Sequence, residues 1–281
     1  MTKERPFRQV DVFASGPFLG NPLAVVADAE DLSDEQMARI ANWTNLSETT
    51  FLLPPTRPDA DYRVRIFTPQ MELPFAGHPT LGSAHVWLSL GGKSGDDTVI
   101  QECDAGLIPV RRDQGRLAFA APPRRRTGPV DPEELAQALM GLHLSPEDLA
   151  DAAWADNGPG WKILRLHDRE TVLRITPDWQ ALAGQKIGVV APWNPARDGT
   201  DAQFEVRAFV GGEGGWEDPV TGSLNAGIAQ WLIESGTAPE HYIASQGTVL
   251  KRAGRVFVDK SGDDIWIGGN VTTHIAGTLT V

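Results

Sequence analysis

The stretch that decides the fold occurs twice, first as VRIF at residues 64–67 with HPTLGS at 78–83, then as VRAF at 206–209 with DPVTGS at 218–223. In each copy a β-branched run typical of a strand leads through a turn to a proline that can begin a helix. The two His/Asp-Pro elements lie 140 residues apart, half of the 281-residue chain. Self-similarity at this spacing indicates a duplication, so we expect two copies of one unit, each a sheet wrapped on a central helix.

The boundary between the copies is predicted at the sequence PPRRRTGP, residues 122–129. Its prolines and positive charges suit neither a helix interior nor a central strand. The N-terminal lobe then spans residues 1–123 and the C-terminal lobe residues 130–281. Whether the last strand returns to the N-terminal lobe stays open.

The pattern of caps, apolar spacing and turn residues predicts an α/β (α+β) protein. Ser33, with Gln36 three residues later, has the spacing of a capping box, and Asp131 before Pro132 has that of a helix start. Helices are expected at 33–42, 79–90, 131–140, from 145, and at 220–234. Strands are expected at 10–13, 23–26, 49–53, 62–67, 98–103, 107–111, 116–120, 162–166, 171–175, 186–191, 205–209, 255–259 and 265–268.

Composition excludes several classes of protein. The 37 acidic and 25 basic residues give a net charge of −12, which repels nucleic acid and anionic membranes alike. The single cysteine, Cys103, cannot form an internal disulfide. No apolar run reaches the roughly 18 to 20 residues of a membrane span, and the N-terminal residues lack an apolar signal core. We therefore expect a cytoplasmic protein that binds neither nucleic acid nor membrane.

A candidate for acid/base chemistry lies in the sequence NLSETTF, residues 45–51. It puts the Glu48 carboxyl group where an apolar strand begins and where neighbouring side chains exclude water. Partial burial raises a carboxyl pKa toward the range that suits proton transfer. Glu48 is thus the candidate acid/base; a solvent-exposed glutamate at a strand edge is the alternative.

The two predicted helix starts offer a binding site for an anion. The backbone N–H groups of a first helical turn attract negative charge, and Gly77, Gly82 and Gly222 would let a ligand approach the backbone closely. Two such starts facing each other, marked by His78 and Asp218, would cradle a small carboxylate. The alternative is that Asp218 is an ordinary helix cap and His78 a turn residue.

Other motifs give weaker signals. His78 and His85 are seven residues apart, but no third metal ligand accompanies them. The sequence GGEGG at 211–215 lacks the spacing of a dinucleotide-binding loop, and Ser223 lacks the Gly-x-Ser-x-Gly context of a nucleophile. We therefore expect no metal and no cofactor.

Taken in order, these elements resemble the PhzF-like family, named for the phenazine biosynthesis isomerase, within the diaminopimelate-epimerase-like superfamily. The resemblance covers nearly the whole chain. It is carried by Asp11-Val12-Phe13, Gly20-Asn21-Pro22, residues 45–51, 65–69, 75–82 and 217–223, Gln246-Gly247 and Gly268-Gly269.

The resemblance implies two pseudo-symmetric lobes of diaminopimelate-epimerase-like fold, each a mixed, curled sheet around a central helix, with the active site in the cleft between them. It also implies a cofactor-free proton transfer and a homodimer. The implied catalytic residues are Glu48, His78 and Asp218, and the implied substrate-binding residues are Asn21, Ser47, Gly77, Gly222 and Ser223. Racemases of the superfamily use two thiols, which a chain with one cysteine cannot supply, so one-base isomerisation is the consistent reading.

The sequence thus predicts an isomerase or epimerase that shifts a proton on a small metabolite carrying a carboxylate or carbonyl group, with Glu48 as acid/base. A non-catalytic small-molecule binding protein with the same cleft is the rival. A metal-dependent hydrolase using His78 and His85 is a third possibility, which a stoichiometric bound metal would support.

Overall fold

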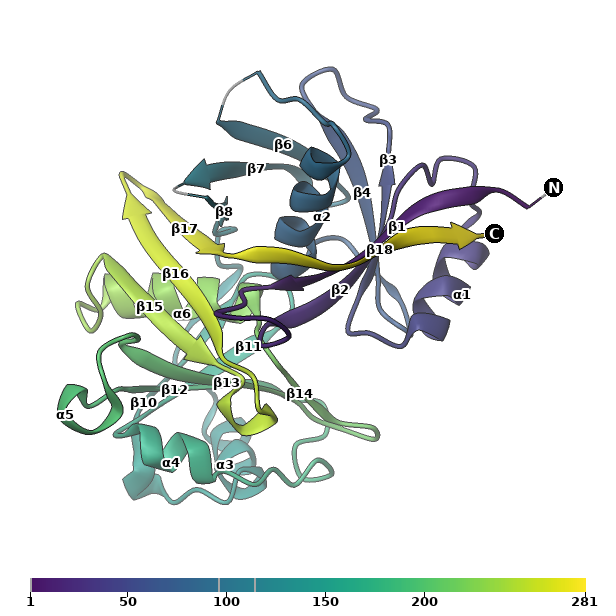
Figure 1. The fold of residues 1–281 in the computed structure, drawn as a ribbon. Helices are drawn as coiled ribbons and strands as arrows, with labels where there is room; N and C mark the ends of the chain where they lie inside the picture. The colour runs from purple at the N-terminus through teal and green to yellow at the C-terminus, as the bar shows by residue number, and fades with distance from the viewer. Residues whose placement is uncertain (1, 96, 114) are drawn as a thin grey trace. The chain divides into compact units, whose positions relative to one another are not determined.

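The chain folds into two units that share one pattern of strand pairing around a central helix. The computed structural model describes residues 2–95, 97–113 and 115–281. Unit 1 comprises Met1–Ala120 together with Gly268–Val281, and unit 2 comprises Ala121–Ile267. The strands of both units form mixed sheets (Figure 1), so the predicted α/β fold class is confirmed.

In unit 1, strands follow one another with α1 and α2 inserted between them. Its elements are β1 (Glu4–Val12), β2 (Asn21–Val26), α1 (Asp34–Thr44), β3 (Thr49–Leu53), β4 (Tyr62–Phe67), β5 (Glu72–Leu73), α2 (Gly77–Ser89), β6 (Thr98–Cys103), β7 (Gly106–Asp113), β8 (Arg116–Ala120) and β18 (Val271–Thr280). Pairing is antiparallel for β18–β1, β1–β2, β3–β4, β4–β5, β6–β7 and β7–β8, and parallel for β2–β3 and β4–β6.

Unit 2 repeats this plan. Its elements are β9 (Arg126–Gly128), α3 (Pro132–Gly141), η1 (Pro146–Asp148), β10 (Leu149–Asp156), β11 (Trp161–Leu166), α4 (Arg169–Arg174), β12 (Lys186–Pro192), α5 (Pro195–Asp198), β13 (Phe204–Val210), β14 (Trp216–Asp218), α6 (Gly222–Glu234), β15 (His241–Gln246), η2 (Thr248–Leu250), β16 (Gly254–Ser261) and β17 (Asp264–Gly269). The order antiparallel, parallel, antiparallel recurs in β10–β11, β11–β12 and β12–β13, and β13 pairs parallel with β15 as β4 does with β6.

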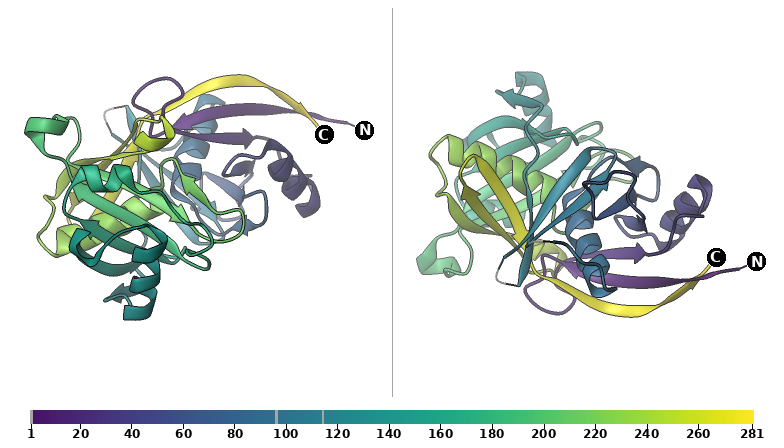
Figure 2. Two further views of the ribbon diagram at one scale, coloured as in Figure 1. Left: turned by 90° about the horizontal axis from the view of Figure 1, so that it is seen from below. Right: turned by 90° about the horizontal axis from the view of Figure 1, so that it is seen from above.

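A long two-stranded ribbon joins the ends of the chain in unit 1. β1 pairs with β18 from Glu4↔Thr280 to Val12↔Val271, with one register shift between Gln9 and Val10. In both views of Figure 2 the two strands run side by side and the termini lie close together. The last strand therefore belongs to the same sheet as the first.

Each unit encloses one helix that is buried on nearly all sides. Nine of the thirteen residues of α2 and nine of the thirteen of α6 are buried. Small residues let the strands approach: a Cβ on Gly82 would come within 2.5 Å of the Leu23 side chain, and one on Gly188 of β12 within 2.3 Å of Leu224. A helix buried in this way can present its first turn only at its end.

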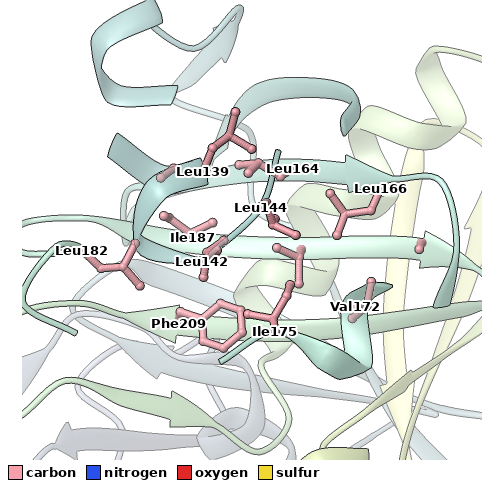
Figure 3. Packing of buried hydrophobic residues seen from close by; sticks show 13 residues of the cluster. Leu139, Leu142, Leu144, Leu164, Leu166, Val172, Ile175, Leu182, Ile187 and Phe209 are labelled. Carbon is pink, nitrogen blue, oxygen red and sulfur yellow. The ribbon is translucent and has the colours of Figure 1, made fainter. Parts of the chain in front are cut away.

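The opposite face of the unit 2 sheet carries an apolar cluster. Figure 3 shows its side chains, from α3, α4, the strands β11 to β13 and the segments that connect them, pointing toward one another. Ile187 and Val189 of β12 lie in this cluster, whereas Gly188 between them faces α6. This alternation is the period-2 pattern of a strand that is covered on both faces. In unit 1 the helix α1 covers the corresponding apolar cluster with Met37 and Ala41.

One ion pair is repeated in both units. Arg65 of β4 donates two hydrogen bonds of 2.7 Å to Glu72 of β5, and Arg207 of β13 donates two of 2.9 and 2.7 Å to Glu217 of β14. A paired guanidinium and carboxylate satisfy each other when buried. The two pairs fix the short strand that leads into each central helix.

Local capping signals correctly predicted two helices. Ser33 and Gln36 form the expected capping box at α1, and the Asp131 side chain accepts the Glu133 N–H at the start of α3, where Pro132 is the first residue.

Other expectations were wrong. Residues 171–175 were expected as a strand, but Arg169–Arg174 form helix α4 because the Asp168 side chain caps it by accepting the Thr171 N–H. The helix expected from Ser145 is a single 3₁₀ turn, after which the chain enters β10.

The central helices also begin elsewhere than expected, α2 at Gly77 instead of 79 and α6 at Gly222 instead of 220. None of the first amides of a helix has a helical partner, so a proline fits at any of the first few positions and does not mark the start. In the part of the chain that the structure describes, no helix is both long and apolar enough to cross a membrane.

Candidate active site

Glu48 lies directly before β3 in unit 1. The helix α1 ends at Thr44 and the chain turns through Asn45, which has a left-handed backbone, before the strand begins at Thr49. The Glu48 side chain is 12% exposed. Ser47, its neighbour in sequence, is half-buried. The turn therefore presents a mostly buried carboxylate at the N-terminal end of β3.

His78 is the second residue of α2 and reaches this carboxylate. Its side chain is 4% exposed, and its Nε2 lies 3.3 Å from Oε2 of Glu48. On the other side of the ring, Asn21, the first residue of β2, brings its Nδ2 within 3.3 Å of His78 Nδ1. Asn21 has no exposed surface. Three predicted site residues of unit 1, distant in sequence, thus meet in one cluster.

Burial keeps His78 uncharged. It lowers the pKa of His78 from 6.5 to about 3, because an imidazolium ion loses its hydration in the interior. A neutral imidazole carries one N–H and one lone pair, so its two nitrogens play different roles.

The start of α2 has no side-chain cap. Its N-cap residue is Ala76, and the first helical hydrogen bond runs from Thr80 N–H to Ala76 O at 3.1 Å. The N–H groups of Gly77 and His78 therefore come before the first hydrogen bond of the helix. They lie next to the His78 ring, which contacts the Glu48 carboxylate. Such amides carry the partial positive charge of a helix N-terminus.

Asp218 in unit 2 ends the strand β14 and lies outside the helix α6. It is 7% exposed, and its Oδ2 accepts a hydrogen bond of 2.5 Å from the Thr221 hydroxyl. The Gln246 side chain donates to the Asp218 backbone oxygen and to Thr221 Oγ1, and accepts from Thr221 N–H, each at 3.0 Å. This network holds the segment between β14 and α6 in place.

Ser223 is the second residue of α6, directly after Gly222. It is 9% exposed, and its Oγ accepts a hydrogen bond of 3.0 Å from Trp161 Nε1. Its backbone oxygen accepts one of 2.8 Å from Asn157 Nδ2. The N-cap residue Thr221 makes no side-chain cap bond, so α6, like α2, begins without one.

The structure corrects the predicted equivalence of His78 and Asp218. Asp218 precedes α6 by four residues, whereas His78 lies inside α2. The corresponding pairs at the two helix starts are Gly77-His78 and Gly222-Ser223, because both helices begin at the glycine. The shared proline misled the sequence comparison, since Pro79 lies within α2 and Pro219 lies before α6.

Sequence reasoning assigned no role to the residues that contact the predicted site residues in unit 2. Thr221 and Gln246 lie in stretches that carry the family resemblance, whereas Trp161 and Asn157 belong to no motif. Trp161 had one available signal: it follows Gly160 at the start of a strand, as Asn21 follows Gly20.

His85 is used elsewhere. Its Nε2 lies 3.0 Å from the Thr273 hydroxyl of β18. Among the described residues, no three His, Cys, Asp or Glu side chains gather in a way that would hold a metal ion.

A surface hollow of about 550 Å³ lies at the other end of α6. Its lining includes Gln230 and Glu234 of α6, with Arg124 and Lys260. At a rise of about 1.5 Å per residue, Glu234 is roughly 16 Å along the helix from Ser223. The hollow contains none of the predicted site residues.

Comparison with known proteins places these features in a family context. The family described as "Phenazine biosynthesis-like protein" matches residues 10–277. The chain is 36% identical over 98% of its length to "Antisense-enhancing sequence 1" of Schizosaccharomyces pombe, which it covers to 98%. It is 32% identical over 90% of its length to trans-2,3-dihydro-3-hydroxyanthranilate isomerase of Pseudomonas aeruginosa, which it covers to 89%.

A solved structure has the same fold. The crystal structure of a phenazine biosynthesis protein of the PhzF family from Enterococcus faecalis superposes with a TM-score of 0.79 at 26% identity, covering 99% of each chain.

Proposed function

Because this chain belongs to the phenazine biosynthesis-like, or PhzF, family of isomerases, we propose that it shifts a proton on a small carboxylate-bearing metabolite with Glu48 as the acid/base. The observation that carries the proposal is the contact of 3.3 Å between the mostly buried Glu48 carboxylate and the buried ring of His78. A carboxylate shielded from water and held by a neighbour is suited to take a proton and return it.

His78 supports this role as a neutral group. With its pKa lowered to about 3 by burial, it carries no net charge near neutral pH. Its single N–H can donate a hydrogen bond to the Glu48 carboxylate, whose Oε2 lies 3.3 Å from Nε2, and so hold that carboxylate in one orientation. Glu48 therefore moves the proton, and His78 stabilises and orients.

The uncapped starts of α2 and α6 supply the second element of the proposal. Removing a proton next to a carboxylate or carbonyl leaves an enolate-like negative charge on the substrate. Backbone N–H groups at helix N-termini stabilise such a charge because they are already oriented toward it and need not reorganise as solvent would. We propose that Gly77 and Gly222 admit the substrate to these amides, and that Ser47, Asp218 and Ser223 take part in binding it.

The first substrate to test is taken from a relative. The relative of Pseudomonas aeruginosa is named for trans-2,3-dihydro-3-hydroxyanthranilate, a cyclic amino acid that carries a carboxylate. The chemistry proposed here requires only a proton on a carbon near such a carboxylate, and it requires no metal and no organic cofactor.

The experiment is turnover in deuterium oxide followed by NMR, with trans-2,3-dihydro-3-hydroxyanthranilate and a set of small cyclic amino acids. We expect deuterium from the solvent on carbon, or movement of a substrate hydrogen to a second carbon. Glu48→Gln should lower the rate about 10²- to 10⁴-fold, the usual contribution of a positioned acid or base. The exposed Glu147→Gln serves as the matched control.

Two results would contradict the proposal. Glu48→Gln within a few-fold of the unaltered protein would remove Glu48 from the reaction. Tight binding of the tested acids with no exchange or conversion would indicate a binding protein that lacks turnover.

A further inference from the structure

Each unit contains a side-chain hydrogen bond between its central helix and a neighbouring strand, and the two bonds join equivalent positions. In unit 1 the donor is Asn21, the first residue of β2, and the acceptor is the side chain of His78, the second residue of α2. In unit 2 the donor is Trp161, the first residue of β11, and the acceptor is the side chain of Ser223, the second residue of α6. β2 pairs antiparallel with β1, and β11 pairs antiparallel with β10, so the two strands hold the same place in their units.

We propose that Asn21 and Trp161 are a matched pair of positioning residues, which hold His78 and Ser223 as hydrogen-bond donors at the two helix starts. In both units an N–H group, which can only donate, makes a hydrogen bond to a lone pair of the side chain on the helix, His78 or Ser223. The hydrogen of that side chain must then point elsewhere. The residue types differ between the units, but the consequence is the same.

In unit 1 the hydrogen bond decides which nitrogen of His78 carries the proton. Asn21 Nδ2 is a donor, so Nδ1 of the ring must offer its lone pair and the proton must reside on Nε2. Nε2 is the atom that lies 3.3 Å from the Glu48 carboxylate. With the amide reversed, the ring proton would move to Nδ1 and the Nε2 lone pair would face a negative oxygen, which is repulsive. The Glu48 carboxylate and the Asn21 amide therefore favour the same tautomer.

In unit 2 the hydrogen bond directs the hydroxyl group of Ser223. An indole N–H has no acceptor capacity, so at 3.0 Å it takes one lone pair of Oγ. Ser223 lies in the first turn of α6, so no preceding helical turn offers a carbonyl to its hydroxyl. Trp161, which is 4% exposed and fixed by the strand, holds Oγ in a position from which the hydroxyl hydrogen is free to reach a ligand.

This inference deepens the proposed function and rests on it only for the effect on rate. If the His78 N–H orients the Glu48 carboxylate and the Ser223 hydroxyl donates to the substrate, loss of either positioning residue slows the proton transfer. Partners that orient a metal-bound imidazole contribute about 10- to 100-fold at metal sites, and this sets the scale for a positioning residue. We expect a loss of this size in kcat, with a smaller change in KM, because the donors act most strongly on the charge that develops during the reaction.

The first test needs no substrate. Nitrogen-15 NMR of the histidine side chains at pH 7 reports which ring nitrogen carries a proton, and the spectrum of His78→Gln identifies the His78 signals among the six histidines. We expect the proton on Nε2 in the unaltered protein. Asn21→Asp keeps the shape of the side chain but replaces the donor by an acceptor, and should place a proton on Nδ1.

The second test is a pair of double-mutant cycles on turnover. Trp161→Phe should lower kcat in the presence of Ser223 but have little further effect in Ser223→Ala, since the residue it positions is already gone. Asn21→Ala should behave in the same way with His78→Gln. Trp154→Phe is the matched control, because Trp154 is also a buried tryptophan of unit 2, and its Nε1 makes no hydrogen bond to any described residue.

The outcomes separate the two proposals. A proton on Nδ1 of His78 in the unaltered protein, or additive losses in both cycles, overturns the positioning roles. The expected tautomers without any isomerase activity would leave the positioning of His78 intact and overturn the proposed function. Should Asn21→Asp fail to fold, the tautomer of the unaltered protein still decides the case for unit 1.

Discussion

The buried, neutral state of His78 makes the stability of the protein depend on pH in a defined direction. In the native state burial lowers the pKa of His78 to about 3, whereas an unfolded histidine titrates near 6.5. As the pH falls below 6.5 the unfolded chain therefore binds a proton that the native chain does not bind. The contribution of His78 to the free energy of unfolding is thus unaffected above pH 6.5 and falls as the pH decreases from 6.5 toward 3.

The size of the effect follows from the same pKa values. One proton taken up only by the unfolded chain costs about 1.4 kcal/mol per pH unit once the pH is well below 6.5. At pH 5.5 the native state should be about 1.4 kcal/mol less stable relative to pH 7.5 on account of His78 alone. His78→Gln removes the titration while keeping a side chain that can donate and accept.

The assay is urea unfolding of both proteins at pH 7.5 and 5.5, with the exposed His167→Gln as control. Apart from the substituted histidine, the titratable groups are the same in all three proteins, so the difference between them isolates His78. We expect the unaltered protein and His167→Gln to lose about 1.4 kcal/mol more than His78→Gln. Equal losses would refute a neutral buried His78. A larger loss in His78→Gln would mean that Glu48 holds the ring as an imidazolium ion.

Three further predictions concern the remaining residues. Asp218→Asn can still accept the Thr221 hydrogen bond but removes a negative charge, so isothermal titration with anthranilate should give equal or tighter binding while kcat falls; equal losses in both would make Asp218 only a structural residue. Burial raises the pKa of the Cys103 thiol, so treatment with iodoacetamide should leave the initial rate unchanged, and rapid inactivation would give this thiol a role in the site. Exhaustive dialysis against EDTA should not change the rate, because the described residues hold no cluster of three metal-ligating side chains; recovery only on adding a metal would contradict this.

Signals within a few residues of one another were read correctly from the sequence. Ser33 and Gln36 are three residues apart, so the capping box depends on local geometry alone. The strand at residues 62–67 and the one at 205–209 were likewise found from composition and spacing. The exception is residues 171–175, where Thr and Val favour a strand but the cap supplied by Asp168 prevails.

The duplication was visible in the sequence, but its register was not. Two similar hexapeptides aligned His78 with Asp218, while the folded helices align His78 with Ser223. A helix start is fixed by which N–H first finds a carbonyl four residues back, and the first turn tolerates proline at several positions. Sequence similarity over six residues could not distinguish these positions.

The sequence by itself determined the repeated strand, turn and helix plan, the caps and the presence of a glutamate at the beginning of a buried strand, because each depends on neighbours along the chain. Only the tertiary structure decided that Asn21 meets His78 across 57 residues and that Trp161 meets Ser223 across 62. Those contacts arise when a strand packs against a buried helix, and no local spacing specifies which side chains then face each other. The same packing removes water from His78, and this burial lowers its pKa and leaves the ring uncharged.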